Sequence, residues 1–215
     1  ERVIDKTGSL KELAPSSDIL IIALPSLTTV ELIPEIARVI GENCIVTDVA
    51  SVKSPIVNVV MEQKDSFSRR FVPGHPIAGS EQSKFSASYA ELFLNRNVIL
   101  TPHEKCTVDS INQVNELWHL LGAKVLGMES SKHDEILAAT SHLPHLLAYS
   151  AVDVLADQQQ REKIFKYAAG GFADFSRLAS SNAKMWSDIF VANAKTTVAV
   201  LDTYIDRLEQ FREQI

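Results

Sequence analysis

A single histidine in a glycine-rich segment is the first candidate for acid–base chemistry. His75 lies in the segment 74–81, GHPIAGSE, where two glycines and a proline predict a stiff loop after a strand. A neutral imidazole held in such a loop could act as a base near pH 7. The same residues are equally compatible with a histidine that only satisfies backbone groups in a tight turn.

A serine lies in the segment 48–53, DVASVK, directly after another predicted strand. Ligands bind at the carboxyl ends of parallel strands in open α/β sheets, so Ser51 could hydrogen-bond a ligand. Ser51 could also cap the helix expected to begin near Pro55, and from position alone capping is the interpretation that we favour.

Two histidines are separated by one helical turn in the segment 141–145, SHLPH. His142 and His145 therefore lie on one helical face, a spacing that a metal ion could use. No third ligand follows at a usual spacing and the flanking residues are apolar, so we expect core or pocket histidines and no metal.

An arginine among apolar residues is the candidate for binding an anion. Arg177 ends the segment 170–177, GGFADFSR, and is either paired within the chain, for example with Asp174, or reserved for an anionic ligand. Internal pairing is the usual state of such an arginine. The chain carries a formal net charge of −6, so an anionic substrate would need a local cation of this kind.

The elements that must position these residues alternate between strand and helix in the first half of the chain. The apolar run 18–24 predicts a strand covered on both faces, and a helical period follows over 28–40. Such alternation is typical of a parallel, doubly wound sheet. The other elements expected here are strands at 44–48, 71–72, 97–101 and 124–128, and helices at 55–61 and 108–121.

The second half of the chain has only helical patterns. One helix is expected from an N-cap at Ser131 onward, with a kink at Pro144, and a second from Ala183 to Phe211. The glycines at 170–171 predict a break between them. We therefore expect a partial, Rossmann-like α/β nucleotide-binding domain over 1–130 and an all-α domain over 131–215.

Composition excludes several classes of protein. With 46% hydrophobic and 22% charged residues the chain is globular, and its longest apolar run is too short for a membrane span. The acidic balance argues against nucleic acid and anionic membranes as partners. Two cysteines cannot form a disulfide framework, Cys44 is expected to be a buried thiol, and no signal-peptide pattern opens the chain, so a cytoplasmic location is expected.

The glycine-rich turn G-x-G-x-x-G of dinucleotide-binding domains does not occur in the sequence. Two interpretations follow: the fold does not bind a dinucleotide, or the sequence begins partway through the domain.

Taken together, the segments resemble the prephenate dehydrogenase family, which includes arogenate and cyclohexadienyl dehydrogenases. The most specific matches are GHPIAG at 74–79 and SHLPH at 141–145, and the resemblance extends over nearly the whole chain. Further matching segments are 23–25, 48–53, 98–102, 133–134, 170–177 and 185–186. Family members carry the glycine-rich turn upstream of the residue that matches Glu1, which favours the second interpretation of its absence.

The resemblance implies NAD- or NADP-linked oxidative decarboxylation of prephenate to 4-hydroxyphenylpyruvate, a step toward tyrosine. It implies that His75 accepts a hydrogen bond or proton from the ring hydroxyl and that Ser51 orients His75 and touches the cofactor. Arg177 would hold a substrate carboxylate, and an ionic network of Glu81 and Asp174 would gate access to it. The remaining residues that we expect to line the substrate pocket are His142, His145, Ser80 and Glu81, and those expected to contact the cofactor are Leu24, Pro25, Asp48 and Ser51.

Lys84 departs from the family pattern, which usually has a glycine there, and this leaves the shape of the loop open.

Other hypotheses are an arogenate or dual-specificity enzyme and a non-catalytic dimeric module on a nucleotide-binding fold. A dehydrogenase acting on a β-hydroxy acid would need a catalytic lysine, for which Lys132 is the nearby candidate.

The apolar stripe of the 183–211 helix predicts a homodimer formed through the C-terminal helices. The sequence does not distinguish NAD from NADP or reveal regulation by tyrosine.

Overall fold

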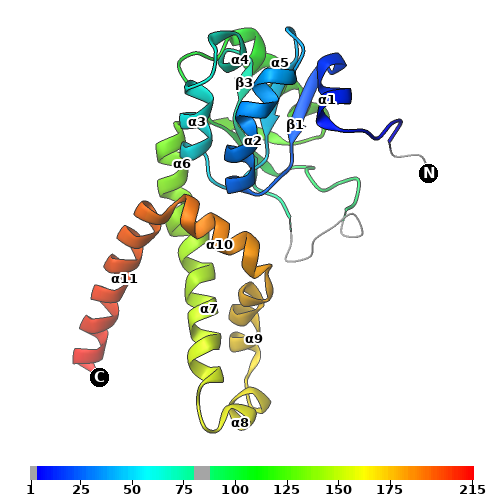
Figure 1. The fold of residues 1–215 in the computed structure, drawn as a ribbon. Coiled ribbons are helices and arrows are strands. Elements are labelled where there is room, and N and C mark those ends of the chain that lie inside the picture. The colour runs from blue at the N-terminus through cyan, green and yellow to red at the C-terminus, as the bar shows by residue number, and fades with distance from the viewer. Residues whose placement is uncertain (1–3, 80–87) are drawn as a thin grey trace. The chain divides into compact units, whose positions relative to one another are not determined.

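The computed structural model describes residues 4–79 and 88–215, which form two compact units (Figure 1). The first unit comprises Glu1–Ala78 and Tyr89–His133, and the second comprises Gly79–Ser88 and Asp134–Ile215. The division of the main chain falls inside one helix, between His133 and Asp134.

A parallel sheet of three strands forms one half of the first unit. Its order is β1 (Ile19–Ile22), β2 (Ile45–Asp48) and β3 (Phe71–Val72), with Ile22 opposite Asp48. We predicted that β1 would be covered on both faces, but Ile21 is 45% exposed, because β1 is an edge strand of the sheet in the described residues. The accompanying helical elements are α1 (Leu10–Leu13), η1 (Ala14–Ser16), α2 (Ser26–Val39), α3 (Ser54–Met61) and α4 (Asp65–Ser68).

A second sheet of three strands forms the other half. Here β4 (Gly74–Pro76) pairs antiparallel with β5 (Asn97–Leu100), and β5 pairs parallel with β6 (Lys124–Gly127). The predicted Rossmann-like domain is confirmed, with parallel pairing in β1–β2–β3 and β5–β6, but the expectation of a parallel sheet fails at β4, which runs antiparallel to β5. The segment that contains His75 was predicted as a loop, yet its first three residues form β4, because their backbone groups pair with β5.

Two clusters of buried apolar residues stabilise the first unit. One lies between the β1–β2–β3 sheet and helices α2 and α3, and includes Ile33, Val46 and Phe71. The other packs the second sheet against α5 (Val108–Leu120), with Trp118 at its centre. Gly122 follows α5 with φ +77°, a conformation that glycine adopts without strain. The buried thiol expected at Cys44 is confirmed, and burial raises its pKa.

The second unit is helical. It begins within α6 (Ser130–Leu137), where Ser131 lies inside the helix and is not its N-cap. A π-helical turn over Ala138–His142 comes directly before α7 (Leu143–Ala156), so the irregularity expected at Pro144 is a wide turn just before the proline. Proline has no N–H for the helical ladder, and a π turn is one way to accommodate it.

The rest of this unit contains short helices around the glycines, and two helices where we expected one from Ala183 to Phe211. After α8 (Arg161–Lys166), the two glycines start α9 (Gly170–Ser176), and a 3₁₀ turn over Arg177–Ser180 follows. The pattern at 183–211 forms two helices, α10 (Ala183–Ala192) and α11 (Ala194–Gln214). They are separated at Asn193, whose side chain makes tertiary hydrogen bonds.

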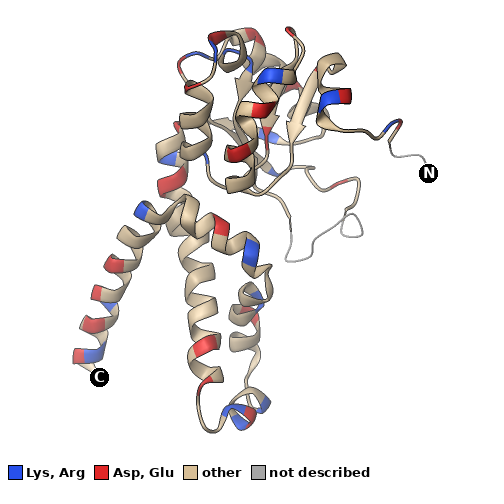
Figure 2. Ribbon diagram, viewed as in Figure 1, with Lys and Arg blue, Asp and Glu red and all other residues tan. Residues whose placement is uncertain are grey.

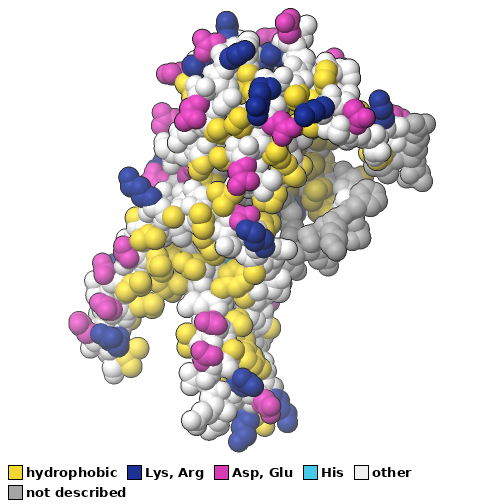
Figure 3. All heavy atoms as spheres, viewed as in Figure 1, with side chains coloured by type: hydrophobic (Ala, Val, Ile, Leu, Met, Phe, Trp, Pro, Cys, Tyr) yellow, Lys and Arg dark blue, Asp and Glu magenta, His cyan; other side chains and the backbone are white. Residues whose placement is uncertain are grey.

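Charged side chains are scattered over the helices and strands, with both signs intermixed along α11 (Figure 2). Apolar side chains are prominent on the helical unit, including the upper part of α11 (Figure 3). On α11 the exposed apolar residues are Val198, Ile205, Leu208 and Phe211. No helix among the described residues is both long and apolar enough to cross a bilayer.

Candidate active site

A pair of histidine rings lies at the end of β4. His75 Nδ1 is 2.9 Å from His133 Nε2, and the two rings meet edge to face with their centroids 5.1 Å apart. His75 is half-buried, whereas His133 is fully buried on α6. The structure therefore gives the candidate base a neighbouring imidazole that the sequence interpretation had not assigned to it.

A buried ion pair fixes the backbone beside His75. Lys53 Nζ donates hydrogen bonds to Asp48 Oδ2 and, at 2.6 Å, to Gly74 O, and both charged side chains are fully buried. Asp48 also accepts hydrogen bonds from Ala50 N (2.9 Å) and Gly74 N (3.3 Å). A Cβ atom at Gly74 would lie 3.1 Å from Asp48 O, so the close approach of the two segments favours glycine. These contacts join the end of β2 to the residue that precedes His75.

The contacts of Asp48 leave its carboxylate inside the protein. We predicted that Asp48 would contact the cofactor, and this geometry gives that prediction no support, because the carboxylate is fully buried and bound by Lys53 and two N–H groups. Its observed role is to hold the backbone of the site.

Ser51 lies on the turn between β2 and α3 and is half-buried. The N-cap residue of α3 is Lys53, so the capping role that we favoured for Ser51 is wrong. Contact of Ser51 with His75 or with a cofactor stays a prediction.

The carboxyl ends of β1 and β2 lie at one edge of the parallel sheet, where nucleotides bind in such folds. Leu24 and Pro25 follow β1, and Leu24 is 40% exposed. Ser26 begins α2, and its buried hydroxyl has no hydrogen-bond partner among the described residues. That hydroxyl is too buried to reach a ligand, but the first N–H groups of a helix have no partner within the helix and suit a phosphate or another polar group of a dinucleotide. The residues present here fit such a cofactor.

A second group of aromatic and basic residues lies within the helical unit. His145 stacks on Trp186, with ring centroids 3.6 Å apart, and its Nδ1 donates to Ser141 O at 3.0 Å. Burial lowers the pKa of His145, the Arg177 guanidinium lowers it further, and the hydrogen bond to Ser141 opposes them. His145 is thereby kept neutral near pH 7, with Nε2 as its acceptor.

His142 is buried and has a different set of partners. Asn193 Nδ2 donates to His142 Nδ1 (3.2 Å) and to Asp134 O (2.8 Å), and the ring of His142 contacts Trp186 edge to face. Since Nδ1 accepts a hydrogen bond, the proton of neutral His142 is on Nε2. The two histidines of the SHLPH segment thus offer opposite hydrogen-bonding groups at their Nε2 atoms.

Arg177 lies at the end of α9 and is exposed, and its effect on the pKa of His145 places the two side chains in one neighbourhood. Asp174 lies one turn earlier on α9. Ser80 and Glu81, which were predicted to contact substrate, and the unusual Lys84 lie outside the described residues.

Sequence reasoning missed the functions of several residues that the structure brings into these clusters. Lys53 was given no role of its own, although its place five residues after Asp48 at a strand end is compatible with an ion pair. His133 and Trp186 were part of the family resemblance but carried no role. Asn193 was hidden inside an apparently continuous helical period.

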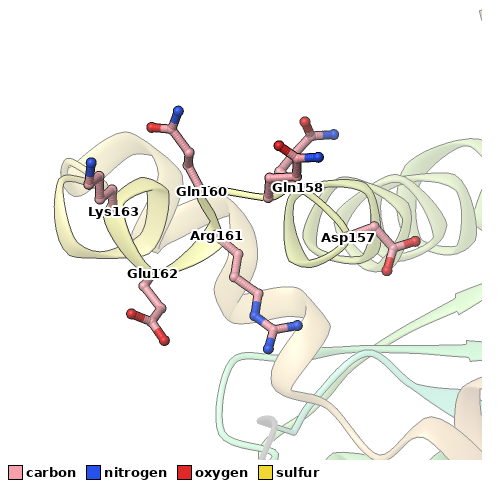
Figure 4. A pocket seen from close by; sticks show the side chains of 7 residues that line it. Asp157, Gln158, Gln160, Arg161, Glu162 and Lys163 are labelled. Atoms are coloured by element: carbon pink, nitrogen blue, oxygen red, sulfur yellow. The ribbon is translucent and has the colours of Figure 1, made fainter.

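A separate hollow lies at the turn between α7 and α8 (Figure 4). It is lined by residues 157–163, none of which is a predicted site residue. Within the described parts of the chain, no group of three or more His, Cys, Asp and Glu side chains is arranged to hold a metal ion.

Comparison with known proteins gives matches over both units. Residues 2–127 match the family model "Prephenate dehydrogenase, nucleotide-binding domain", and residues 129–215 match "Prephenate dehydrogenase, dimerization domain". The chain is 32% identical to the cyclohexadienyl dehydrogenase of Zymomonas mobilis over 97% of its own length and 71% of that protein. It is 31% identical to the prephenate dehydrogenase of Lactococcus lactis over 99% of its length, but spans only 57% of that relative.

A solved structure of similar fold is prephenate dehydrogenase from Aquifex aeolicus. It superposes with a TM-score of 0.88 at 33% identity, covering 96% of this chain and 73% of the Aquifex chain. The same Aquifex enzyme has been solved in complex with hydroxyphenyl propionate and NAD+, and this complex matches with a TM-score of 0.84.

Proposed function

The chain belongs to the prephenate dehydrogenase family, and from this premise we propose that the protein of which it forms part oxidatively decarboxylates prephenate to 4-hydroxyphenylpyruvate with NAD or NADP. The observation that carries the proposal is the position of His75. Its imidazole is half-buried on β4, and the preceding residue, Gly74, is held by the buried Lys53–Asp48 ion pair. Both units of the chain match the family. The NAD+ complex of the Aquifex relative supports the choice of cofactor class.

His75 acts on the ring hydroxyl of the substrate. Its Nε2 accepts the hydroxyl proton as the carbon that bears the hydroxyl loses hydride, and the nicotinamide cofactor supplies the hydride acceptor when it is bound. Loss of carbon dioxide makes the ring aromatic, and the proton on His75 can then return to the phenolic oxygen. The balance is prephenate and NAD⁺ to 4-hydroxyphenylpyruvate, carbon dioxide and NADH, so the protein needs mainly a proton acceptor and precise positioning.

Arg177 supplies the local cation for a carboxylate of the substrate. A guanidinium can hold a carboxylate through two parallel hydrogen bonds, which fixes orientation as well as charge. We assign His142 and His145 to the same pocket, with one donor and one acceptor at their Nε2 atoms. Ser80 and Glu81 complete the proposed substrate contacts, and Glu81 and Asp174 the ionic network around Arg177.

Leu24, Pro25 and Ser51 are the proposed cofactor contacts. The support for them is their position after β1 and β2, at the edge of the sheet where α2 begins. At this position Ser51 could contact both the cofactor and His75.

The test of the activity uses the complete natural protein with prephenate and either NAD⁺ or NADP⁺. Formation of reduced cofactor together with 4-hydroxyphenylpyruvate is the expected result. Arogenate is the matched comparison, because it differs only in an amine in place of the keto oxygen. No reduced cofactor with either substrate would contradict the proposal and favour a non-catalytic module.

We also propose that the helical unit forms a homodimer. The support is the family model's own description of this region and the apolar residues exposed on α11. Ile205→Glu should weaken the dimer, because it buries a charge in the interface, whereas Gln210→Glu, which adds the same charge away from the apolar face of α11, should not. Sedimentation that shows a stable monomer of the unaltered protein at micromolar concentration would contradict this proposal.

A further inference from the structure

The ring of His75 has two nitrogens, and the proposed reaction requires them to differ. Nε2 can accept a proton only when it carries none, so in the neutral ring the proton must be on Nδ1. In water the two neutral tautomers interconvert, and a ring with its proton on Nε2 is inactive as a base. The protein therefore needs a group that accepts a hydrogen bond from Nδ1.

His133 is the group placed against that nitrogen. The distance of 2.9 Å between His75 Nδ1 and His133 Nε2 is that of a good hydrogen bond, and the pair shares one proton across it. If His75 donates, its own Nε2 carries no proton and can act as an acceptor toward the substrate. If His133 donates, the proton of neutral His75 is on Nε2 and the base is blocked.

The surroundings of His133 hold its ring in place. The side chain is fully buried, and the backbone N–H of His133 donates to Glu129 O at 2.9 Å near the start of α6. The planes of the two rings are inclined at 63°, and in this arrangement Nε2 of His133 lies 2.9 Å from Nδ1 of His75. A buried, fixed partner can select one tautomer, whereas a mobile surface group cannot.

We propose that His133 is a positioning residue whose Nε2 accepts the Nδ1–H of His75 and so keeps Nε2 of His75 unprotonated, the form that can take the proton of the ring hydroxyl. The inference rests on the proposed function, in which His75 is the proton acceptor, and adds a second residue to it. The logic is that of a triad in which the third group orients the base, with a neutral imidazole in place of the carboxylate.

The experiment compares two substitutions of His133 in the complete natural protein. His133→Gln can place its amide oxygen near the position of Nε2 and retains an acceptor, whereas His133→Phe keeps a ring of similar shape and removes it. His133→Phe should lower kcat roughly tenfold to a hundredfold with little change in KM for prephenate, and His133→Gln should recover most of the loss. If His133→Phe does not fold, His133→Asn replaces it, because its shorter amide does not reach the position of Nε2.

A direct readout is the tautomer of His75, measured by nitrogen-15 NMR of histidine-labelled protein, with His75→Asn to assign the signal. We expect the neutral ring to carry its proton on Nδ1 in the natural protein and in His133→Gln, and to show a mixture or the opposite tautomer in His133→Phe. A His75 tautomer that is the same in His133→Phe as in the natural protein would overturn the inference. So would a proton on Nε2 in the natural protein.

The two proposals fail in different ways. Near-normal kcat in His75→Asn would overturn the proposed role of His75, whatever its tautomer. A large loss of kcat in His75→Asn together with full activity in His133→Phe would overturn the role of His133 alone.

Discussion

The two units of the chain differ in how far their own residues stabilise them. In the described residues both clusters of buried apolar side chains lie in the first unit, and they pack on the sheets whose strands carry His75 and lead into the turn at Ser51. The second unit buries a shorter list of apolar residues, among them Leu143, Ala148 and Trp186, and exposes apolar side chains along several helices. A buried apolar core thus surrounds the functional groups of the first unit, whereas fewer buried apolar residues surround those of the second.

The described ion pairs differ in burial. Lys53 and Asp48 in the first unit are fully buried and hold two strands together. Lys105 and Asp65, also in the first unit, are 31% and 77% exposed, and Lys184 and Asp188 on α10 of the second unit are 81% and 8% exposed. Removing one partner of a buried ion pair strongly lowers the free energy of unfolding, whereas an exposed ion pair contributes little to it.

Lys53→Met is the variant that should sharpen this difference most. It leaves the Asp48 carboxylate buried without its cation, and we expect a loss of about 3–5 kcal/mol in the free energy of unfolding. Chemical denaturation measures the change. Lys105→Met is the matched control, because it breaks the ion pair with Asp65 in which both side chains are partly or largely exposed, and its effect should stay below about 1 kcal/mol. Equal losses in the two variants would contradict the comparison.

Arg177→Ala should weaken substrate binding more than it weakens the fold. Loss of a charge-assisted contact with a carboxylate costs about 1.5–3 kcal/mol, which corresponds to a rise in KM for prephenate of roughly tenfold to a hundredfold. Arg177→Lys keeps the charge without the planar fork and should still raise KM clearly. Steady-state kinetics would count against this role if KM in Arg177→Ala were unchanged.

The smallest effect that we predict is electrostatic. Burial and then Arg177 lower the pKa of His145, so Arg177→Gln should raise that pKa without restoring the ordinary value, because burial remains. Acidification should also destabilise the second unit, since below about pH 6.5 the unfolded chain binds a proton that folded His145 resists. An NMR titration of His145 measures this pKa. An unchanged pKa in Arg177→Gln would contradict the electrostatic effect of Arg177 on His145.

Much of the first unit could be predicted from sequence, because apolar runs and helical periods there reflect a core made by the same residues. β2, α3, α5 and β6 agree with the expected ranges within one or two residues. The antiparallel direction of β4 could not be read from three residues that contain a glycine and a proline, since pairing with β5 decides it. In the second unit the helical period continues through Asn193, and only its tertiary hydrogen bonds explain the break there.

The same limit applies to the site. Residue types and the family resemblance identified His75, Ser51 and Arg177 as candidates. The partners of His75 could not be found in this way, because Lys53 and His133 reach it only through the folding of distant segments. A lysine after a strand and a histidine at a helix start have many ordinary roles in sequence.

The most direct test of the account is the pH dependence of kcat for His75→Asn beside the natural protein. The natural enzyme should gain activity as pH rises through the titration of its histidine base, because protonation removes the acceptor. His75→Asn should bind cofactor normally, lose about 10²–10⁴ in kcat and lose that acidic limb. A variant that keeps near-normal kcat, or keeps the limb unchanged, would show that the base is another residue, with His142 and His145 the next to examine.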